Sequence, residues 1–103
     1  MGDKYQEDGD VVTLTKPKTK RPKLYKVLMH NDDYTPMEFV VKVMQEVFHK
    51  SYEEATHLML TVHTKGMAVC GTYPFSVAES KVTKVTGMAK ENGHPLKCTM
   101  EQA

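Results

Sequence analysis

The sequence predicts a small α+β domain, a two-layer sandwich in which three helices cover one face of a three-stranded sheet. Three observations predict it: three short strand-like runs, three stretches with apolar residues at helical spacing, and the chain order β-α-α-β-α-β that they give. At 103 residues the chain has room for one domain with a modest core. Its hydrophobic fraction of 40% and charged fraction of 26% are typical of globular proteins.

The first 22 residues differ in composition from the rest of the chain. Acidic side chains dominate the first ten positions, and the stretch TKPKTKRPK that follows is rich in lysine and proline. Such a segment cannot bury enough surface to offset the entropy of ordering it. We therefore expect a flexible N-terminal extension over residues 1–22 and a folded domain over residues 23–103. The basic stretch is compatible with a nucleic-acid contact, but a solvated linker is the favoured interpretation.

The first strand and first helix follow directly from local patterns. The run LYKVLM, residues 24–29, alternates in a way that predicts a strand with one face buried and the other partly buried. Thr35 is expected as a helix N-cap, Pro36 as the first helical residue, and Glu38 as the partner of Thr35 in a Thr-x-x-Glu capping box. Apolar residues at helical spacing extend this helix to about Phe48.

Two further helices open with the same signature. Ser51–Glu54 is expected to open the second helix, which Gly66 ends as a C-cap, and Ser76–Glu79 is expected to open the third. The third helix is expected to end at Gly93 and Pro95. Two more strands are predicted, MAVCGTY between the second and third helices and LKCTM after the third.

Several classes of function are disfavoured by absent patterns. The two cysteines, Cys70 and Cys98, fit no CxxC spacing and are expected to be buried free thiols in a reducing compartment. There is no long apolar run and no secretory leader, so a cytoplasmic protein that does not span a membrane is expected. No fingerprint of a common enzyme class is present, so no catalytic residue and no cofactor are expected.

The stretch HNDDYTPMEF, residues 30–39, holds the strongest candidate site. Asp32 and Asp33 are adjacent carboxylates. A turn in which an Asx side chain accepts backbone N–H groups accounts for one of them. It accounts less well for the second, because Thr35 is already expected to cap the helix. Flexible apolar residues are expected beside this loop: Met37, Val40, Met59 and Val62. Carboxylates next to an apolar hollow suit a cation joined to an apolar group. An amino-terminal residue with a bulky side chain has that chemistry, although a metal ion or a polyamine would also satisfy the charge.

His63 has two interpretations that the sequence leaves open. Near the C-terminal end of the second helix its cation is favoured by the helix dipole. Alternatively, it is a neutral imidazole that faces the Asn-Asp-Asp loop. A metal site is also conceivable from the carboxylates and imidazoles of this region, namely His30, Asp32, Asp33 and His63.

The segments LYKVLMHNDDYTPMEFVVKVM, ATHLMLTVH, AVCGTYPFSVAESKV and HPLKCTMEQA closely resemble the ClpS family of bacterial N-degron (N-end rule) adaptors, from Leu24 to the C-terminus. The resemblance implies an α/β sandwich without catalysis. It implies binding of substrates that begin with Leu, Phe, Tyr or Trp. It also implies their delivery to a Clp AAA+ unfoldase of the ClpA type, whose partner peptidase degrades them. A monomer is expected, with no cofactor, metal, nucleic acid or membrane partner.

The resemblance also assigns roles to residues. Asn31, Asp33 and His63 match the ligands of the substrate α-ammonium group, and Asp32 supports the loop. Seven residues match the side-chain pocket: His30, Thr35, Met37, Val40, Met59, Val62 and Leu96. Met37 matches the gatekeeper that excludes β-branched side chains. Glu79 and Lys81 match the unfoldase-docking surface, and residues 1–22 match the extension that engages the unfoldase during delivery.

Two residues depart from the family pattern. His30 stands where the family usually has an aliphatic residue, and Ser76 stands where many members have an acidic one. The departure at His30 bears on which N-terminal residues of substrates are preferred. The departure at Ser76 bears on how strongly the adaptor docks on the unfoldase. Two functions of other classes remain as alternatives to a peptide-binding adaptor: a small metal-dependent hydrolase using the loop carboxylates and histidines, and a ribosome- or RNA-associated module using the basic stretch.

Overall fold

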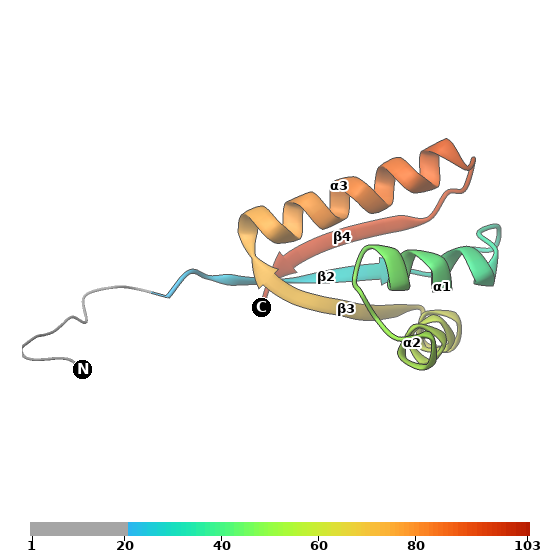
Figure 1. Ribbon diagram of the computed structural model, residues 1–103, viewed down its shortest axis with the longest axis horizontal. Helices are drawn as coiled ribbons and strands as arrows, with labels where there is room; N and C mark the ends of the chain where they lie inside the picture. The colour runs from blue at the N-terminus through green and yellow to red at the C-terminus, as the bar shows by residue number, and fades with distance from the viewer. Residues whose placement is uncertain (1–20) are drawn as a thin grey trace, which may run out of the picture.

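The computed structural model describes residues 21–103, in which helices pack on one face of a three-stranded sheet (Figure 1). The elements follow one another as β2 (Leu24–His30), α1 (Met37–Glu46), α2 (Tyr52–Lys65), β3 (Met67–Pro74), α3 (Phe75–Glu91) and β4 (Lys97–Gln102). The predicted α+β class and the order β-α-α-β-α-β are thereby confirmed. The predicted extension, residues 1–22, lies outside the described residues except for its last two positions.

The sheet has the strand order β3-β2-β4, and β2 pairs with both neighbours in antiparallel fashion. β3 and β4 therefore run parallel to each other on either side of β2, and α3 makes the crossover between them (Figure 1). β2 is the central strand, and its C-terminal end leads into the loop that carries the adjacent carboxylates. The order of the strands thus places this loop at one end of the middle of the sheet.

A bulge interrupts the pairing of β2 with β3. Val27 pairs with Gly71 and Leu28 pairs with Val69, which leaves Cys70 as the extra residue on β3. The glycine has a packing reason, because a Cβ atom at Gly71 would collide with the ring of Tyr73. A side chain at position 71 would therefore displace the Tyr73 ring from its present place.

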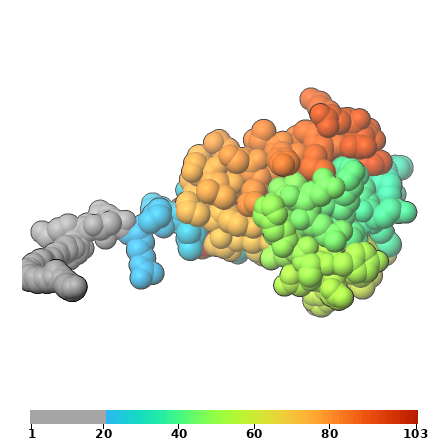
Figure 2. All heavy atoms as spheres, in the orientation of Figure 1, coloured from blue at the N-terminus to red at the C-terminus, as the bar shows by residue number. Residues whose placement is uncertain are grey.

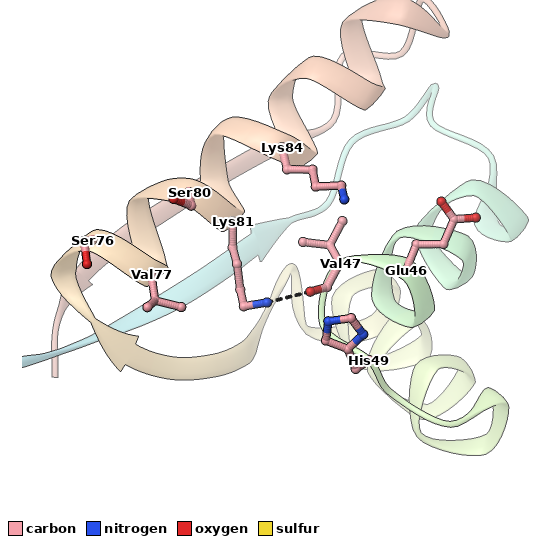
Figure 3. Close-up of a pocket in the computed structure, with 8 residues that line it drawn as sticks. All are labelled: Glu46, Val47, His49, Ser76, Val77, Ser80, Lys81 and Lys84. Carbon is pink, nitrogen blue, oxygen red and sulfur yellow. Dashed lines mark hydrogen bonds between the residues drawn. The ribbon is translucent and has the colours of Figure 1, made fainter.

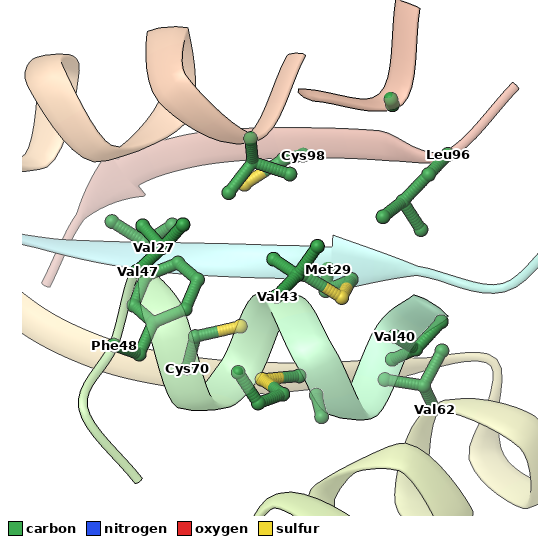
Figure 4. Packing of buried hydrophobic residues seen from close by; sticks show 14 of the residues in the cluster. Val27, Met29, Val40, Val43, Val47, Phe48, Val62, Cys70, Leu96 and Cys98 are labelled. Atoms are coloured by element: carbon green, nitrogen blue, oxygen red, sulfur yellow. The ribbon is translucent and has the colours of Figure 1, made fainter. Parts of the chain in front are cut away.

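The core lies between the sheet and the helices (Figure 4). Val27 and Met29 of β2 are fully buried there, and Leu28 on the opposite face is only 4% exposed. The alternation predicted for this strand is therefore confirmed, including the partial burial of its second face. Cys70 and Cys98 are buried free thiols, as predicted.

The three helices cover the same face of the sheet. α3 contacts all three strands, whereas α2 packs against α1 and β3. In the space-filling view the helices meet in one layer that hides most of the sheet (Figure 2). None of the helices in residues 21–103 is long and apolar enough to cross a membrane.

The capping of α2 agrees with the prediction. The side chain of Ser51 accepts a hydrogen bond from the Glu54 N–H at 3.1 Å, and the Glu54 carboxylate accepts one from the Ser51 N–H at 3.2 Å. Gly66 ends the helix in the left-handed conformation, with φ of 88°. The reciprocal capping box and the glycine C-cap of this helix are therefore confirmed.

The N-terminal capping predicted for the other two helices is wrong. α1 begins at Met37 with Pro36 as its N-cap, and α3 begins at Phe75 with Pro74 as its N-cap. Both prolines are extended, with ψ of 144° and 158°, and neither side chain can accept a hydrogen bond. Thr35 and Ser76, the predicted caps, therefore lie outside and inside their helices respectively. Thr35 is held by a different contact, described below.

Candidate functional site

The loop after β2 is fastened to the end of α2. The N–H of Asn31 donates a hydrogen bond of 2.9 Å to the carbonyl oxygen of Gly66, the C-cap of that helix. This bond joins the first residue of the loop to the last turn of α2, where His63 lies. Segments far apart in the sequence are thereby brought together at one end of the sheet.

Asp32 organises the loop from within. Its carboxylate accepts three hydrogen bonds, from the N–H of Tyr34 at 2.8 Å, the N–H of Thr35 at 2.8 Å and the hydroxyl of Thr35 at 2.7 Å. The Thr35 hydroxyl therefore donates to Asp32, and α1 has no side-chain cap. Burial raises the pKa of Asp32, but the hydrogen bonds from Thr35 and Tyr34 and the charge of His94 outweigh it, so the pKa is lowered. The expected Asx turn explains this carboxylate.

A hollow of about 200 Å³ lies beside this loop, and we call it the loop hollow. Its lining comprises Asn31, Asp32, Asp33, Thr35, Met37, Val40, Met59, Val62 and His63. The polar members come mainly from the loop and the last turn of α2, and the apolar members come from α1 and α2. The structure thus brings together nine of the eleven residues predicted for the ammonium ligands and the side-chain pocket.

The remaining two, His30 and Leu96, line a smaller adjoining hollow of about 20 Å³, the inner hollow. It shares Asn31, Asp32, Thr35, Val40 and Val62 with the loop hollow. A volume of this size holds about one water molecule. A bulky side chain that enters from the loop hollow would therefore have to move the walls of the inner hollow apart.

The imidazole of His30 already has a partner. Its Nε2 lies 2.7 Å from the hydroxyl oxygen of Thr99 on β4. The buried neighbours of these two residues, Met29 and Cys98, point toward the helices, so alternation places His30 and Thr99 on the open face of the sheet. His30 therefore borders the inner hollow while its ring is held on the other side of the sheet.

A larger hollow of about 370 Å³ lies between the end of α1 and the first half of α3, and we call it the lysine hollow (Figure 3). Its lining comprises Glu46, Val47, His49, Ser76, Val77, Ser80, Lys81 and Lys84. Of the two predicted docking residues it contains Lys81 but not Glu79, which is exposed elsewhere on α3. Ser76, the second departure from the family pattern, also borders it.

The ammonium group of Lys81 is used within the fold. Its Nζ donates a hydrogen bond of 2.7 Å to the carbonyl oxygen of Val47, the C-cap of α1 (Figure 3). The same nitrogen lies 5.7 Å from the centroid of the Phe48 ring and 5.1 Å from that of Tyr73. Lys81 therefore satisfies the end of α1 and makes two cation–π contacts.

The other candidate chemistries find little support. Among residues 21–103, no group of three or more His, Cys, Asp or Glu side chains is placed to hold a metal ion. Burial raises the pKa of both Cys70 and Cys98 to about 12, so neither thiol is ionised near neutral pH. The alternative of a metal site thus has no structural basis in these residues, and the two cysteines are unreactive buried thiols.

His94 is a residue near the site to which the sequence analysis gave no role. Its ring is half-buried and meets the ring of Phe39 edge-on, with 4.6 Å between the centroids. The same histidine lies near enough to Asp32 to lower the pKa of that carboxyl. A contact between α1 and the segment after α3 leaves no local pattern, so only the folded arrangement reveals it.

Comparison with known proteins decides the family. The family model described as "ATP-dependent Clp protease adaptor protein ClpS" matches residues 20–99. The chain belongs to the ClpS family. It is therefore an adaptor of the Clp protease and not an enzyme, as the resemblance implied.

Individual relatives agree with this assignment. The chain is 54% identical to the ClpS adapter of Rhodospirillum centenum over 103 residues, covering 97% of this chain and 95% of that one. It is 58% identical to the adapter of Caulobacter vibrioides over 94 residues, covering 91% and 86%. The solved structure of Agrobacterium tumefaciens ClpS2 bound to L-phenylalaninamide superposes with a TM-score of 0.78 at 44% identity, covering 81% of this chain and all of that one.

Proposed function

We propose that this adaptor binds substrates through their N-terminal residue, when that residue is Leu, Phe, Tyr or Trp and its α-amino group is free. It then delivers them to a ClpA-like AAA+ unfoldase for degradation by the associated peptidase. One observation carries the proposal: the loop hollow sets the polar groups of Asn31, Asp33 and His63 beside apolar side chains of α1 and α2. A free amino terminus on a bulky apolar side chain has the matching chemistry.

The polar side of the loop hollow can accept an ammonium group. An N-terminal ammonium has three N–H donors, and the Asp33 carboxylate, the Asn31 amide oxygen and an unprotonated His63 nitrogen are three acceptors. Within residues 21–103, no hydrogen bond or ion pair uses the carboxylate of Asp33, whereas that of Asp32 accepts three. Asp33 can therefore receive the ammonium without breaking an internal contact.

The apolar side can take the first side chain. Val40 and Val62 are buried at 6% and 3% exposure, whereas Met37 is 45% exposed. A long, flexible and exposed methionine suits a gate that adapts to planar or γ-branched side chains and clashes with a branch at Cβ. Leu96 bounds the inner hollow, which widens as the side chain enters. His30 is predicted to narrow the range of side chains, although its bond to Thr99 offers the ring a place away from them.

The ligand of the related ClpS2 structure supports this assignment. L-Phenylalaninamide has a free α-amino group and a benzyl side chain, and an amide replaces its carboxylate, as in the first residue of a peptide. It therefore presents the two groups to which we assign the polar and apolar sides of the loop hollow.

We further propose that the lysine hollow and Glu79 face the unfoldase. The hollow joins apolar Val77, 41% exposed, to the cationic groups of Lys81 and Lys84, so a partner segment with apolar and acidic side chains fits it. Residues 1–22 serve as the extension that the unfoldase engages during delivery. The adaptor acts as a monomer in the cytoplasm, where such a protease meets its substrates.

The experiment is a series of labelled peptides that differ only in their first residue, measured by fluorescence anisotropy. Peptides that begin with Leu, Phe, Tyr or Trp should bind, and those that begin with Gly, Asp or Val should not. A matched variant, Glu53→Ala on the exposed side of α2, should bind as the parent does. Equal binding of all first residues would contradict the proposed function.

A further inference from the structure

The inner hollow lies where β2 and β4 separate. The last pair of their ladder is His30 with Lys97. Beyond this pair the two chains diverge, because Asn31 enters the loop and Leu96 belongs to the segment that comes from α3. His30, Asn31 and Leu96 all line the inner hollow. The width of this hollow therefore depends on how firmly the end of the ladder is closed.

A side-chain contact closes this end of the ladder. The Nε2 atom of His30 lies 2.7 Å from the hydroxyl oxygen of Thr99. Thr99 pairs with Leu28, so the contact runs diagonally, from the last residue of β2 to a position two residues beyond Lys97 on β4. Imidazole and hydroxyl groups can each donate or accept, so either tautomer of the ring makes this bond. We call the contact the clasp.

The other walls of the inner hollow are held by packing or by hydrogen bonds. Val40 of α1 and Val62 of α2 are buried, with 6% and 3% exposure. Asp32 and Thr35 hold each other through two hydrogen bonds. The end of a strand ladder frays more easily than such walls move, because further pairs support it on one side only. The clasp therefore secures the wall that yields most easily.

We propose that Thr99 is a specificity-determining residue that acts through His30: the clasp keeps the inner hollow narrow and thereby favours Leu over Trp as the first residue of a substrate. This inference rests on the proposed function, because it assigns the clasp to the binding of an N-terminal residue. Thr99 lines neither hollow, so it positions a wall and does not touch the ligand. The indole of Trp is much larger than the isobutyl group of Leu, so it requires more widening of a hollow of about 20 Å³.

The experiment measures the ratio of the affinities for Trp- and Leu-initiated peptides, by competition with a labelled Leu peptide. Thr99→Val removes the hydroxyl but keeps the shape of the side chain, so it breaks the clasp. Thr99→Ser keeps a hydroxyl at the same position. Thr72→Val is the matched control, because Thr72 is an exposed threonine of β3 whose side chain makes no hydrogen bond within residues 21–103.

In Thr99→Val, the affinity for the Trp peptide relative to the Leu peptide should rise about three- to tenfold, the scale of one neutral hydrogen bond. In Thr99→Ser and Thr72→Val, the ratio should stay at the parent value. His30→Leu breaks the clasp from its other end and should also raise the ratio. Adding Thr99→Val to His30→Leu should then change nothing further, because no bond remains to be removed.

The two proposals fail in different ways. A parent that binds neither peptide, or binds all first residues equally, contradicts the proposed function, whatever Thr99 does. A selective parent whose ratio is unchanged in Thr99→Val overturns the role of the clasp. A purely structural role of Thr99 would give that result, because it would lower the melting temperature and weaken both peptides alike. An equal effect of Thr99→Val with and without His30→Leu would likewise overturn the inference, since the hydroxyl would then act without His30.

Discussion

The loop hollow and the lysine hollow both combine charged and apolar side chains, but they use their charges differently. In the loop hollow, Asp33 lies exposed and free of any hydrogen bond or ion pair to the rest of residues 21–103. In the lysine hollow, the ammonium of Lys81 bonds to Val47 and lies over two aromatic rings. A charge without an internal partner can bind a ligand at no structural cost. A charge with internal partners stabilises the fold, and a ligand that binds it must compete with those partners.

The largest effect should follow removal of the unpartnered charge. Asp33→Ala should weaken binding of Phe-initiated peptides by about 10- to 150-fold, because a charge-assisted hydrogen bond is worth about 1.5–3 kcal/mol. The melting temperature should not change, since Asp33 supports nothing in the fold. Titration calorimetry and thermal unfolding measure the two quantities. Glu38→Ala, an exposed carboxylate of α1, is the control, and an equal loss there would refute the special role of Asp33.

The gate should control selectivity more than affinity. Met37→Ala should let the loop hollow accept Val- and Ile-initiated peptides, because removing the long side chain leaves room for a branch at Cβ. The ratio of Leu to Val affinity should fall by about tenfold, the scale for one misfitting methylene in an apolar pocket. Competition with a labelled Leu peptide measures it. An unchanged ratio would show that another residue excludes β-branched side chains.

Asp32 should couple binding to stability, in contrast to its neighbour. Asp32→Ala should lower both peptide affinity and the free energy of unfolding, the latter by about 1–2 kcal/mol for the lost turn contacts. Because the folded-state pKa of Asp32 is lowered, its contribution is present above its unfolded pKa, near 3.8, and is lost as pH falls through the folded value. Urea unfolding of the parent and of Asp32→Asn from pH 2 to pH 6 should show the difference shrinking at low pH. A constant difference would contradict this account.

Lys81 and Lys84 allow the same comparison, between a charge with internal partners and one without, to be made at the lysine hollow. Lys81→Met should lower stability by about 1 kcal/mol, the scale for one hydrogen bond, and should also weaken delivery to the unfoldase. Lys84→Met should weaken delivery without changing stability, because Lys84 makes no hydrogen bond or ion pair among the described residues. Thermal unfolding and degradation of an N-degron reporter separate the effects. Delivery unaffected by both changes would remove the lysine hollow as a docking surface.

Much of the fold was predictable because it follows local patterns. Alternation defined β2, and Ser51, Glu54 and Gly66 defined the ends of α2, since each of these signals acts over a few residues. The caps of α1 and α3 were mispredicted because Pro36 and Pro74 take the capping positions and the Thr35 hydroxyl prefers Asp32. Short polar side chains have several partners within reach, and the sequence does not rank them.

The location of the candidate site was also predictable, but some of its contacts were not. The adjacent carboxylates and the helical spacing of apolar residues pointed to the loop hollow, and the family resemblance supplied individual roles. The bond of His30 to Thr99 and the contact of His94 with Phe39 were not predictable. Both depend on which strands and loops become neighbours, which is a property of the sheet order and not of any local stretch.

The central claim is that the loop hollow reads a free amino terminus. It is tested most directly by comparing a Phe-initiated peptide with its N-acetylated form at neutral pH. Acetylation removes the charge and two N–H donors but leaves the side chain unchanged, so several charge-assisted hydrogen bonds are lost.

The free peptide should bind, and the acetylated one should bind at least about 100-fold more weakly, a loss of roughly 3 kcal/mol. Binding of the free peptide should also weaken as the pH rises past the pKa of an α-amino group, about 8. An acetylated peptide that binds as well as the free one would contradict the account, and with it the roles of Asn31, Asp33 and His63.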